Sequence, residues 1–115
     1  MSIGIGIIGT GGISNSHVRG YQANASLGKI VAVADIDGAR AEEAASRWGV
    51  DYFTTDYREI LARDDVDVVS VCTYNQAHRQ PTVDALAAGK HVLCEKPMAA
   101  TLDDAKAMAK AARDC

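Results

Sequence analysis

A glycine-rich turn directly after a short apolar run is the feature that most constrains how this chain can fold. The apolar run covers residues 3–9, and Gly9-Thr10-Gly11 leads from it into a helix that we expect to begin near Ile13. The first glycine allows a tight turn, and the second allows an anionic group to approach the backbone. The helix would direct its free N–H groups and the positive end of its dipole at that anion. The turn therefore predicts a strand, turn and helix that bind the pyrophosphate of a dinucleotide.

The third glycine position of such turns is occupied here by Ser14. A small residue at this position still permits close packing of the helix on the strand, although the match to the pattern is weaker. A turn that only connects a strand to a helix is the alternative interpretation. The candidate pyrophosphate-binding residues are Gly9, Thr10, Gly11, Gly12 and Ile13.

Short apolar runs alternate with helical periodicity along the whole chain, which is typical of a parallel sheet with crossover helices. We expect strands over residues 3–9, 29–35, 51–54, 66–72 and 91–95. Besides the helix after the glycine turn, we expect helices over residues 38–48 and 81–88 and a last one that begins after Thr101. Asp37 and Thr101 are expected N-caps, and Gly49 and Gly89 are expected stops.

This order of elements predicts the α/β fold class, as a doubly wound parallel sheet (Rossmann) with strand order 3-2-1-4-5. The ligand crevice should then lie between the first and fourth strands, where the winding reverses. A chain of 115 residues has room for one domain, so we expect residues 1–115 to form a single dinucleotide-binding domain. We expect no sixth strand within these 115 residues, and the open edge of the fifth strand is then a candidate surface for homo-oligomer formation.

The predicted second strand ends at Asp35, where a carboxylate can accept hydrogen bonds from the ribose hydroxyls of an adenosine. The next residue is Ile36 and not an arginine that would bind a 2′-phosphate, so NAD is favoured over NADP. A solvated acid at a strand end is the alternative interpretation. Methyltransferases that bind S-adenosylmethionine also combine a glycine turn with a second-strand acid, so these features alone do not exclude them.

Composition narrows the class of protein further. The net charge is −3, and Lys and Arg are scattered without a basic run, which argues against nucleic acid as a ligand. The N-terminal apolar run is too short for a membrane span and lacks the charged flank of a signal peptide, so we expect a cytoplasmic protein without a membrane partner. Cys72, Cys94 and Cys115 show no C-x-x-C spacing. We therefore expect reduced thiols, two of them in buried strands, and neither disulfides nor a metal site.

Two later segments resemble motifs of one known family. The segment Thr73-Tyr74-Asn75-Gln76-Ala77-His78 resembles the T-P-N-x-x-H segment of the Gfo/Idh/MocA family of sugar and polyol dehydrogenases. The segment Gly89-Lys90-His91-Val92-Leu93-Cys94-Glu95-Lys96-Pro97 closely resembles its A-G-K-H-V-x-x-E-K-P signature. Together with the glycine turn and Asp35, the resemblance covers essentially the whole chain as the N-terminal domain of that family. Tyr74 departs from the usual proline of the first segment.

The resemblance implies an NAD-dependent oxidoreductase that transfers hydride between nicotinamide and a sugar, inositol or polyol substrate. Lys96 matches the family's lysine near the nicotinamide and the substrate hydroxyl, and we expect it to be catalytic. A cation at that place can orient an alcohol and stabilise an alkoxide. Thr73, Asn75, His78 and Glu95 are further expected cofactor-binding residues, as is Lys96 itself. His78 is equally well explained as a first-turn residue of a helix, and His17 and His91 are weaker candidates.

In the family, a second domain supplies most of the substrate pocket and a histidine that acts as acid and base. This sequence contains neither, so we expect the isolated chain to bind NAD with little dehydrogenase activity, and we favour a fragment of a longer enzyme. The alternative is a non-catalytic nucleotide-binding module, or a truncated product that acts by binding NAD or a partner chain. Such a module would have no use for Lys96 beside Glu95, which favours the enzyme.

Overall fold

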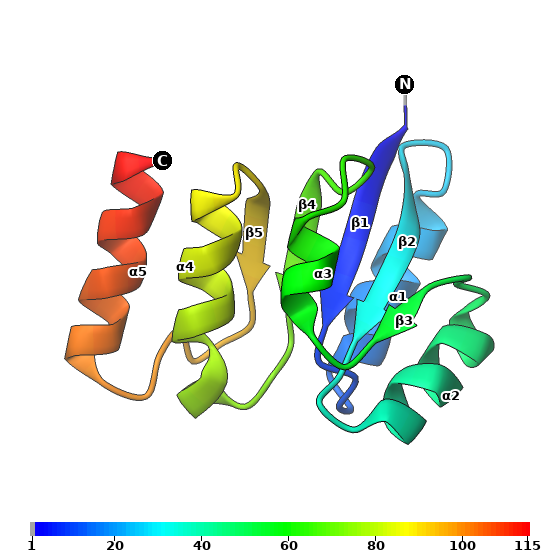
Figure 1. Ribbon diagram of the computed structural model, residues 1–115, viewed down its shortest axis with the longest axis horizontal. Helices are drawn as coiled ribbons and strands as arrows, with labels where there is room; N and C mark the ends of the chain where they lie inside the picture. The colour runs from blue at the N-terminus through cyan, green and yellow to red at the C-terminus, as the bar shows by residue number, and fades with distance from the viewer. Residues whose placement is uncertain (1) are drawn as a thin grey trace.

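A five-stranded parallel sheet organises the computed structural model, which describes residues 2–115 except for the side chain of Asn75 (Figure 1). The strand order is β3-β2-β1-β4-β5, so the predicted fold class and strand order are confirmed. The strands are β1 (Ile3–Ile8), β2 (Gly28–Ala34), β3 (Phe53–Thr54), β4 (Val68–Val71) and β5 (His91–Cys94). The neighbours of β1 are β2 and β4, and this is the point at which the winding reverses.

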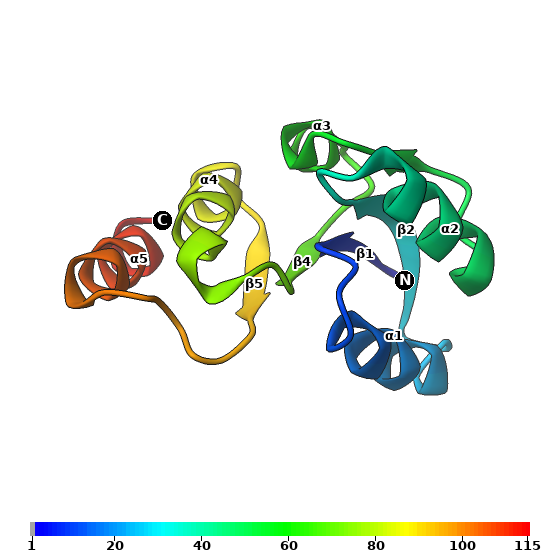
Figure 2. The same cartoon turned by 90° about the horizontal axis from the view of Figure 1, so that it is seen from below.

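Within residues 2–115, four α-helices pack against the sheet, a fifth packs against the fourth, and a short 3₁₀ turn (Asn75–Ala77) follows β4. The first two helices pack on one face of the sheet and the next two on the other, and Figure 2 shows the last helix beside α4. The helices are α1 (Ser14–Ala23), α2 (Gly38–Trp48), α3 (Tyr57–Leu61), α4 (Arg79–Ala87) and α5 (Leu102–Asp114). No helix within residues 2–115 has both the length and the apolar character that a membrane span requires.

Alternating side chains of the central strands build a separate core on each face of the sheet. Ile5 and Ile7 pack with Val18 of α1 and Ala44 of α2, whereas Ile8 lies on the opposite face in a cluster around α3 and α4. This alternation follows from the two-residue period of a strand. Both faces of β1 are therefore buried, which is why the apolar run in the sequence is continuous.

The expected helix boundaries largely hold because the capping residues act as their chemistry predicts. Asp37 accepts hydrogen bonds from the N–H groups of the first turn of α2, and Thr101 accepts one from Asp104. Gly49 and Gly89 take up left-handed φ angles of 71° and 81° where α2 and α4 end.

Several expected elements are corrected by the structure. A fifth helix, α3, was not expected; its N-cap is Asp56, and it lies between β3 and β4. The third strand is two residues long, and the fourth begins at residue 68 instead of 66. Cys72 is buried directly after β4, whereas Cys94 in β5 is only half-buried, so the expectation that two cysteines lie in buried strands is wrong for Cys94. The reason is that β5 is an edge strand, on which His91 and Leu93 remain exposed.

Candidate functional site

A groove of about 540 Å³ lies at the carboxyl ends of the central strands. Ligands of doubly wound folds bind at this edge, next to the strand pair where the winding reverses. The groove is formed by the turn after β1, the end of β2, the start of α2 and the loop after β4. Its lining residues are Ile8, Gly9, Thr10, Gly11, Gly12, Ile13, Ala34, Asp35, Ile36, Asp37, Arg40, Thr55, Tyr57, Cys72, Thr73, Tyr74 and Ala77.

Gly9 is required by the close approach of the β1 turn to the end of β4. Its φ is 94°, and a Cβ built there would lie 2.8 Å from the Cys72 carbonyl carbon and 2.8 Å from the Thr73 nitrogen. A side chain would therefore be strained both by the backbone angle and by contact with a neighbouring backbone. The Gly9 N–H donates to Ala34 O at 2.8 Å, which ties the turn to β2.

The turn presents backbone N–H groups to the open groove. Within residues 2–115 the N–H groups of Gly11, Gly12 and Ile13 make no hydrogen bond, because they precede the first turn of α1. A Cβ at Gly12 would meet no atom within 4 Å, so this backbone is open to a ligand. The arrangement suits an anion at the N-terminus of α1.

Ser14, at the position of the usual third glycine, stabilises the turn through its own side chain. It is fully buried, and its hydroxyl donates to Gly11 O at 2.5 Å. A serine therefore satisfies the packing limit of this position and closes the turn with an additional hydrogen bond. The weaker match to the sequence pattern has a structural explanation.

Asp35 lies at the end of β2 and is bound to the glycine turn. Its Oδ2 accepts hydrogen bonds from Thr10 N at 2.9 Å and from Thr10 Oγ1 at 2.6 Å, and its Oδ1 accepts one from Asp37 N at 2.9 Å. Burial alone would raise the pKa of Asp35, but these hydrogen bonds and the charge of Arg40 together lower it below its usual value. The groove therefore contains a carboxylate that is ionised at neutral pH.

Arg40 is a groove residue that was not expected from the sequence. It lies in the first turn of α2, and its Nη2 is 3.9 Å from the position that a Gly11 Cβ would take. Its guanidinium therefore faces the space between the glycine turn and Asp35. The expectation was drawn from residue 36 alone, although the N-cap at Asp37 brings the residues after it to the same edge of the sheet.

Glu95 and Lys96 follow β5 and lie outside the lining of the groove. The Lys96 side chain is exposed, and the Lys96–Pro97 peptide bond is cis. Glu95 Oε2 lies 2.7 Å from His17 Nε2, and Glu95 Oε1 accepts a hydrogen bond from Lys96 N at 3.1 Å. These contacts with His17 first, and then with the Lys96 N–H, lower the pKa of Glu95. Lys96 follows β5, and β5 is the neighbour of β4 in the sheet. Because the loop after β4 forms part of the groove, Lys96 lies just after the strand next to one that borders the groove.

His78 is turned away from the groove, in contrast to the expectation that it binds the cofactor. It is 1% exposed, its Nε2 lies 2.8 Å from Thr73 O and its Nδ1 lies 2.9 Å from Pro97 O. Both ring nitrogens therefore contact the backbone of the two loops that follow β4 and β5. Thr73 lines the groove, and the side chain of Asn75 lies outside the described part of the structure.

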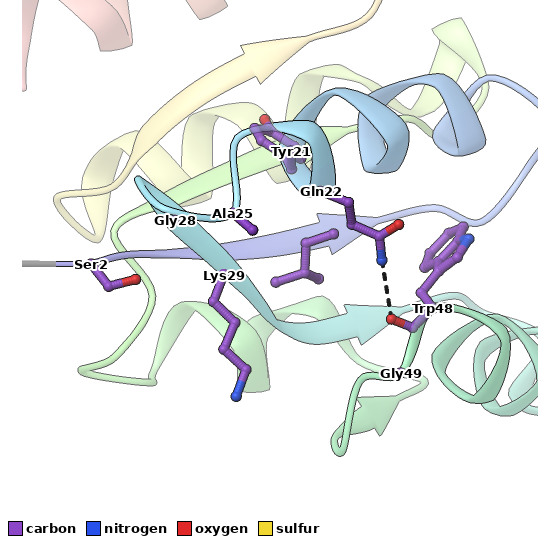
Figure 3. Close-up of a pocket in the computed structure, with 9 residues that line it drawn as sticks. Ser2, Tyr21, Gln22, Ala25, Gly28, Lys29, Trp48 and Gly49 are labelled. Carbon is purple, nitrogen blue, oxygen red and sulfur yellow. Dashed lines mark hydrogen bonds between the residues drawn. The ribbon is translucent and has the colours of Figure 1, made fainter.

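A second hollow of about 340 Å³ lies at the opposite, amino-terminal edge of the sheet (Figure 3). It is lined by the ends of α1 and α2 and the start of β2. Gln22 crosses it and donates to Trp48 O at 3.2 Å, and Tyr21 is hydrogen bonded to Ser70. The candidate site is the groove at the carboxyl edge, because ligands of doubly wound folds bind at that edge.

Comparison with known proteins identifies relatives of this chain among sugar and inositol oxidoreductases. Inositol 2-dehydrogenase of Gluconacetobacter diazotrophicus is 43% identical over 105 residues, which are 90% of this chain and 31% of that protein. The 1,5-anhydro-D-fructose reductase of Ensifer adhaerens is 40% identical over 109 residues, 95% of this chain and 32% of that protein. This chain therefore spans about a third of the length of these relatives.

The solved structure of levoglucosan dehydrogenase in complex with NADH matches 99% of this chain and 32% of its own chain, with a TM-score of 0.94 and 34% identity. Residues 3–114 match the family model described as an oxidoreductase family with an NAD-binding Rossmann fold. The chain thus belongs to the Gfo/Idh/MocA oxidoreductase family, and these residues are its NAD-binding Rossmann domain.

Proposed function

We propose that residues 1–115 are the cofactor-binding domain of a dehydrogenase that transfers hydride between nicotinamide and an alcohol of sugar, inositol or polyol type. The observation that carries the proposal is the groove, in which free N–H groups and an ionised carboxylate face the same space. The inositol and levoglucosan dehydrogenases to which the chain is similar are named for alcohols of this class.

Each part of the groove suits one part of a dinucleotide. The N–H groups of Gly11 and Gly12 suit the pyrophosphate oxygens. Among residues 2–115, Asp35 Oδ1 accepts one hydrogen bond and has the capacity to accept another from a ribose hydroxyl. Thr73 and Asn75 follow β4, where the nicotinamide half of the cofactor would lie.

Lys96 is the proposed catalytic residue. Within the described part of the chain its ammonium group makes no hydrogen bond, so it remains available to a substrate. NAD, when bound, supplies the hydride acceptor or donor. The lysine would orient the alcohol and stabilise the negative charge that develops on its oxygen. Glu95 and His78 would support the loops behind the site and not contact the cofactor directly.

The charge of Asp35 also supports a preference for NAD over NADP. An ionised carboxylate at the ribose position repels a 2′-phosphate, and Thr10 and Asp37 hold this carboxylate in place. Arg40 acts in the opposite direction, because its guanidinium faces the same space. We expect Asp35 to dominate, since its position is fixed by three hydrogen bonds.

The direct test is a titration of the chain with NADH, followed by nicotinamide fluorescence. We expect saturable binding that Asp35→Ala weakens at least about tenfold, the equivalent of one hydrogen bond to a charged group. Glu42→Ala, an exposed acid on α2, is the matched control and should leave the affinity unchanged. Equal affinity for NADPH and NADH would contradict the preference, and absence of NADH binding would overturn the proposal.

A nucleotide-binding module without chemistry remains the second candidate, because the groove is complete without Lys96. Lys96→Ala separates the two functions. In a dehydrogenase it should abolish turnover of the complete enzyme and leave NADH affinity within about twofold, since removal of a charge that acts only in the transition state lowers kcat. Lys106→Ala, an exposed lysine on α5, is the control. Unchanged turnover in the Lys96 variant would favour the binding module.

We also propose a partner for the chain and a location in the cell. Leu93 of β5 is 52% exposed, and no strand among residues 2–115 pairs with the outer edge of β5. We propose that a second copy of the chain pairs at this edge. Sedimentation of a monomer at high concentration would contradict it. A cytoplasmic location is consistent with the three free cysteines.

A further inference from the structure

A chain of hydrogen-bonded side chains connects the core of the domain to the loop that carries Lys96. Tyr21 Oη lies 2.6 Å from Ser70 Oγ, His17 Nδ1 lies 3.0 Å from the same hydroxyl, and His17 Nε2 lies 2.7 Å from Glu95 Oε2. Ser70 is fully buried, and the His17 side chain is 9% exposed. The sequence made His17 only a weak candidate for cofactor binding, and His17 does not line the groove.

The directions of these hydrogen bonds follow from the protons that are available. Glu95 is ionised and accepts from His17 Nε2–H. With a neutral imidazole, His17 Nδ1 then accepts from the Ser70 hydroxyl, which accepts in turn from Tyr21. This arrangement gives every polar atom of the buried chain a partner. Removing one member would leave the others with an unsatisfied buried group, which is costly.

Ser70, His17 and Glu95 have the composition of a nucleophilic triad, but their geometry excludes that role. Ser70 lies within β4, is 0% exposed and has no access to a substrate. The chain of hydrogen bonds can therefore act only at its other end, on the Glu95 carboxylate.

Glu95 transmits this restraint to Lys96. Its Oε2 is held by His17, while its Oε1 accepts the Lys96 N–H at 3.1 Å. On the far side of the lysine, Pro97 O lies 2.9 Å from His78 Nδ1. The backbone of the exposed Lys96 is thus anchored before and after the residue, whereas its ammonium group makes no hydrogen bond within the described part of the chain.

We propose that His17 is a positioning residue that acts through Glu95 to hold Lys96 in register with the nicotinamide end of the groove. The consequence for catalysis rests on the function proposed above. A catalytic cation on a loosely held loop would lose rate because the reacting geometry would be populated less often. The restraint itself is a property of the folded chain and can be measured without cofactor.

The test compares His17→Ala with His17→Gln in the 115-residue chain, with His91→Ala at the exposed histidine of β5 as the control. Carboxyl NMR titration should show that the pKa of Glu95 rises towards its ordinary value in His17→Ala. Hydrogen exchange of the Lys96 amide should accelerate at least about tenfold, as expected for a lost hydrogen bond to a charged group. His17→Gln retains a donor near the Nε2 position and should restore part of both effects.

An unchanged pKa of Glu95 and unchanged exchange of the Lys96 amide in His17→Ala would overturn the proposal. Equal changes of both quantities in His17→Ala and His17→Gln would also overturn it, because they would assign the effect to packing. If His17→Ala does not fold, Glu95→Gln tests the same contact from its more exposed side, and normal Lys96 exchange there would overturn the proposal. These measurements need no NADH, so a failure of cofactor binding would reject only the proposed function.

In the complete dehydrogenase, His17→Ala should lower kcat about tenfold and leave the KM for NAD within about twofold, because the groove is untouched. An unchanged kcat alongside altered Glu95 titration would show that the restraint does not position the lysine. A loss of NAD affinity equal to the loss of kcat would also contradict it, since it would indicate damage to the groove.

Discussion

Three glycine substitutions separate the reasons for which this fold requires glycine. Gly49 has a φ of 71°, but a Cβ added there would meet no atom within 4 Å, so Gly49→Ala tests the backbone angle alone. Gly9 has a φ of 94°, and a Cβ there would lie 2.8 Å from the backbone of Cys72 and Thr73. Gly11 has no left-handed φ, and its Cβ would meet only Arg40 at 3.9 Å, so Gly11→Ala should affect ligand binding and not folding.

The expected losses of stability follow from these differences. A left-handed backbone costs a non-glycine residue about 1–2 kcal/mol, which is the expected effect of Gly49→Ala. Overpacking against a fixed backbone adds about 1–3 kcal/mol, so Gly9→Ala should cost ~2–5 kcal/mol. Gly11→Ala should stay within about 0.5 kcal/mol of the unmodified chain, as is usual for open sites.

Thermal unfolding and NADH titration of the three variants measure both properties. At roughly 4 °C per kcal/mol for a domain of this size, Gly49→Ala should lower Tm by about 4–8 °C and Gly9→Ala by about 8–20 °C. Gly11→Ala should keep its Tm and lose NADH affinity, because its methyl group would occupy the space that a pyrophosphate approaches. If Gly9→Ala is as stable as Gly49→Ala, contact with the end of β4 is not the reason for Gly9. If Gly11→Ala binds NADH normally, the pyrophosphate does not approach there.

Three further predictions concern titrating groups. Thr10→Val should raise the pKa of Asp35, because it removes the hydrogen bond of 2.6 Å from Thr10 Oγ1 to Asp35 Oδ2. That bond stabilises the fold above the ordinary pKa of 3.8, and its contribution is lost as pH falls through the lowered pKa of Asp35. The Tm of the variant should therefore approach the Tm of the unmodified chain in acid. The pKa of Tyr57 is raised to about 12, mainly by burial. Tyr57 therefore stabilises the fold below pH 10, and this contribution is lost as pH rises towards 12. Tyr57→Phe should show a shallower fall in Tm over this range. Burial raises the pKa of the Cys72 thiol to about 12, so a thiol reagent at pH 8 should modify the exposed Cys115 first; equal labelling rates would contradict its burial.

The parts of the fold that depend on local chemistry could be predicted from the sequence. The turn after β1 has its glycines where the backbone requires them, and Asp37 and Thr101 begin helices because their side chains reach N–H groups two or three residues ahead. The helix α3 was missed because it has five residues, too few to show an apolar period. The groove residues that the sequence predicted lie in the glycine turn and at the ends of the strands. The carboxyl ends of parallel strands meet at one edge of the sheet, so the predicted sheet places these residues together.

The two histidines show why the rest of the site could not be predicted. His78 follows a strand and begins a helix, so its position suggested the groove, yet its ring turns inwards to the backbone of two loops. His17 lies three residues after Ser14 and four before Tyr21, on the buried face of α1, where a polar side chain needs a partner. That periodicity is present in the sequence and indicates a buried polar contact for His17. It does not identify the partner, because Glu95 is 78 residues away. Glu95 is brought to His17 by the pairing of β5 with β4. A long-range pairing of this kind depends on the assembled sheet, so the order of the strands had to be known before the contact between His17 and Glu95 could be inferred.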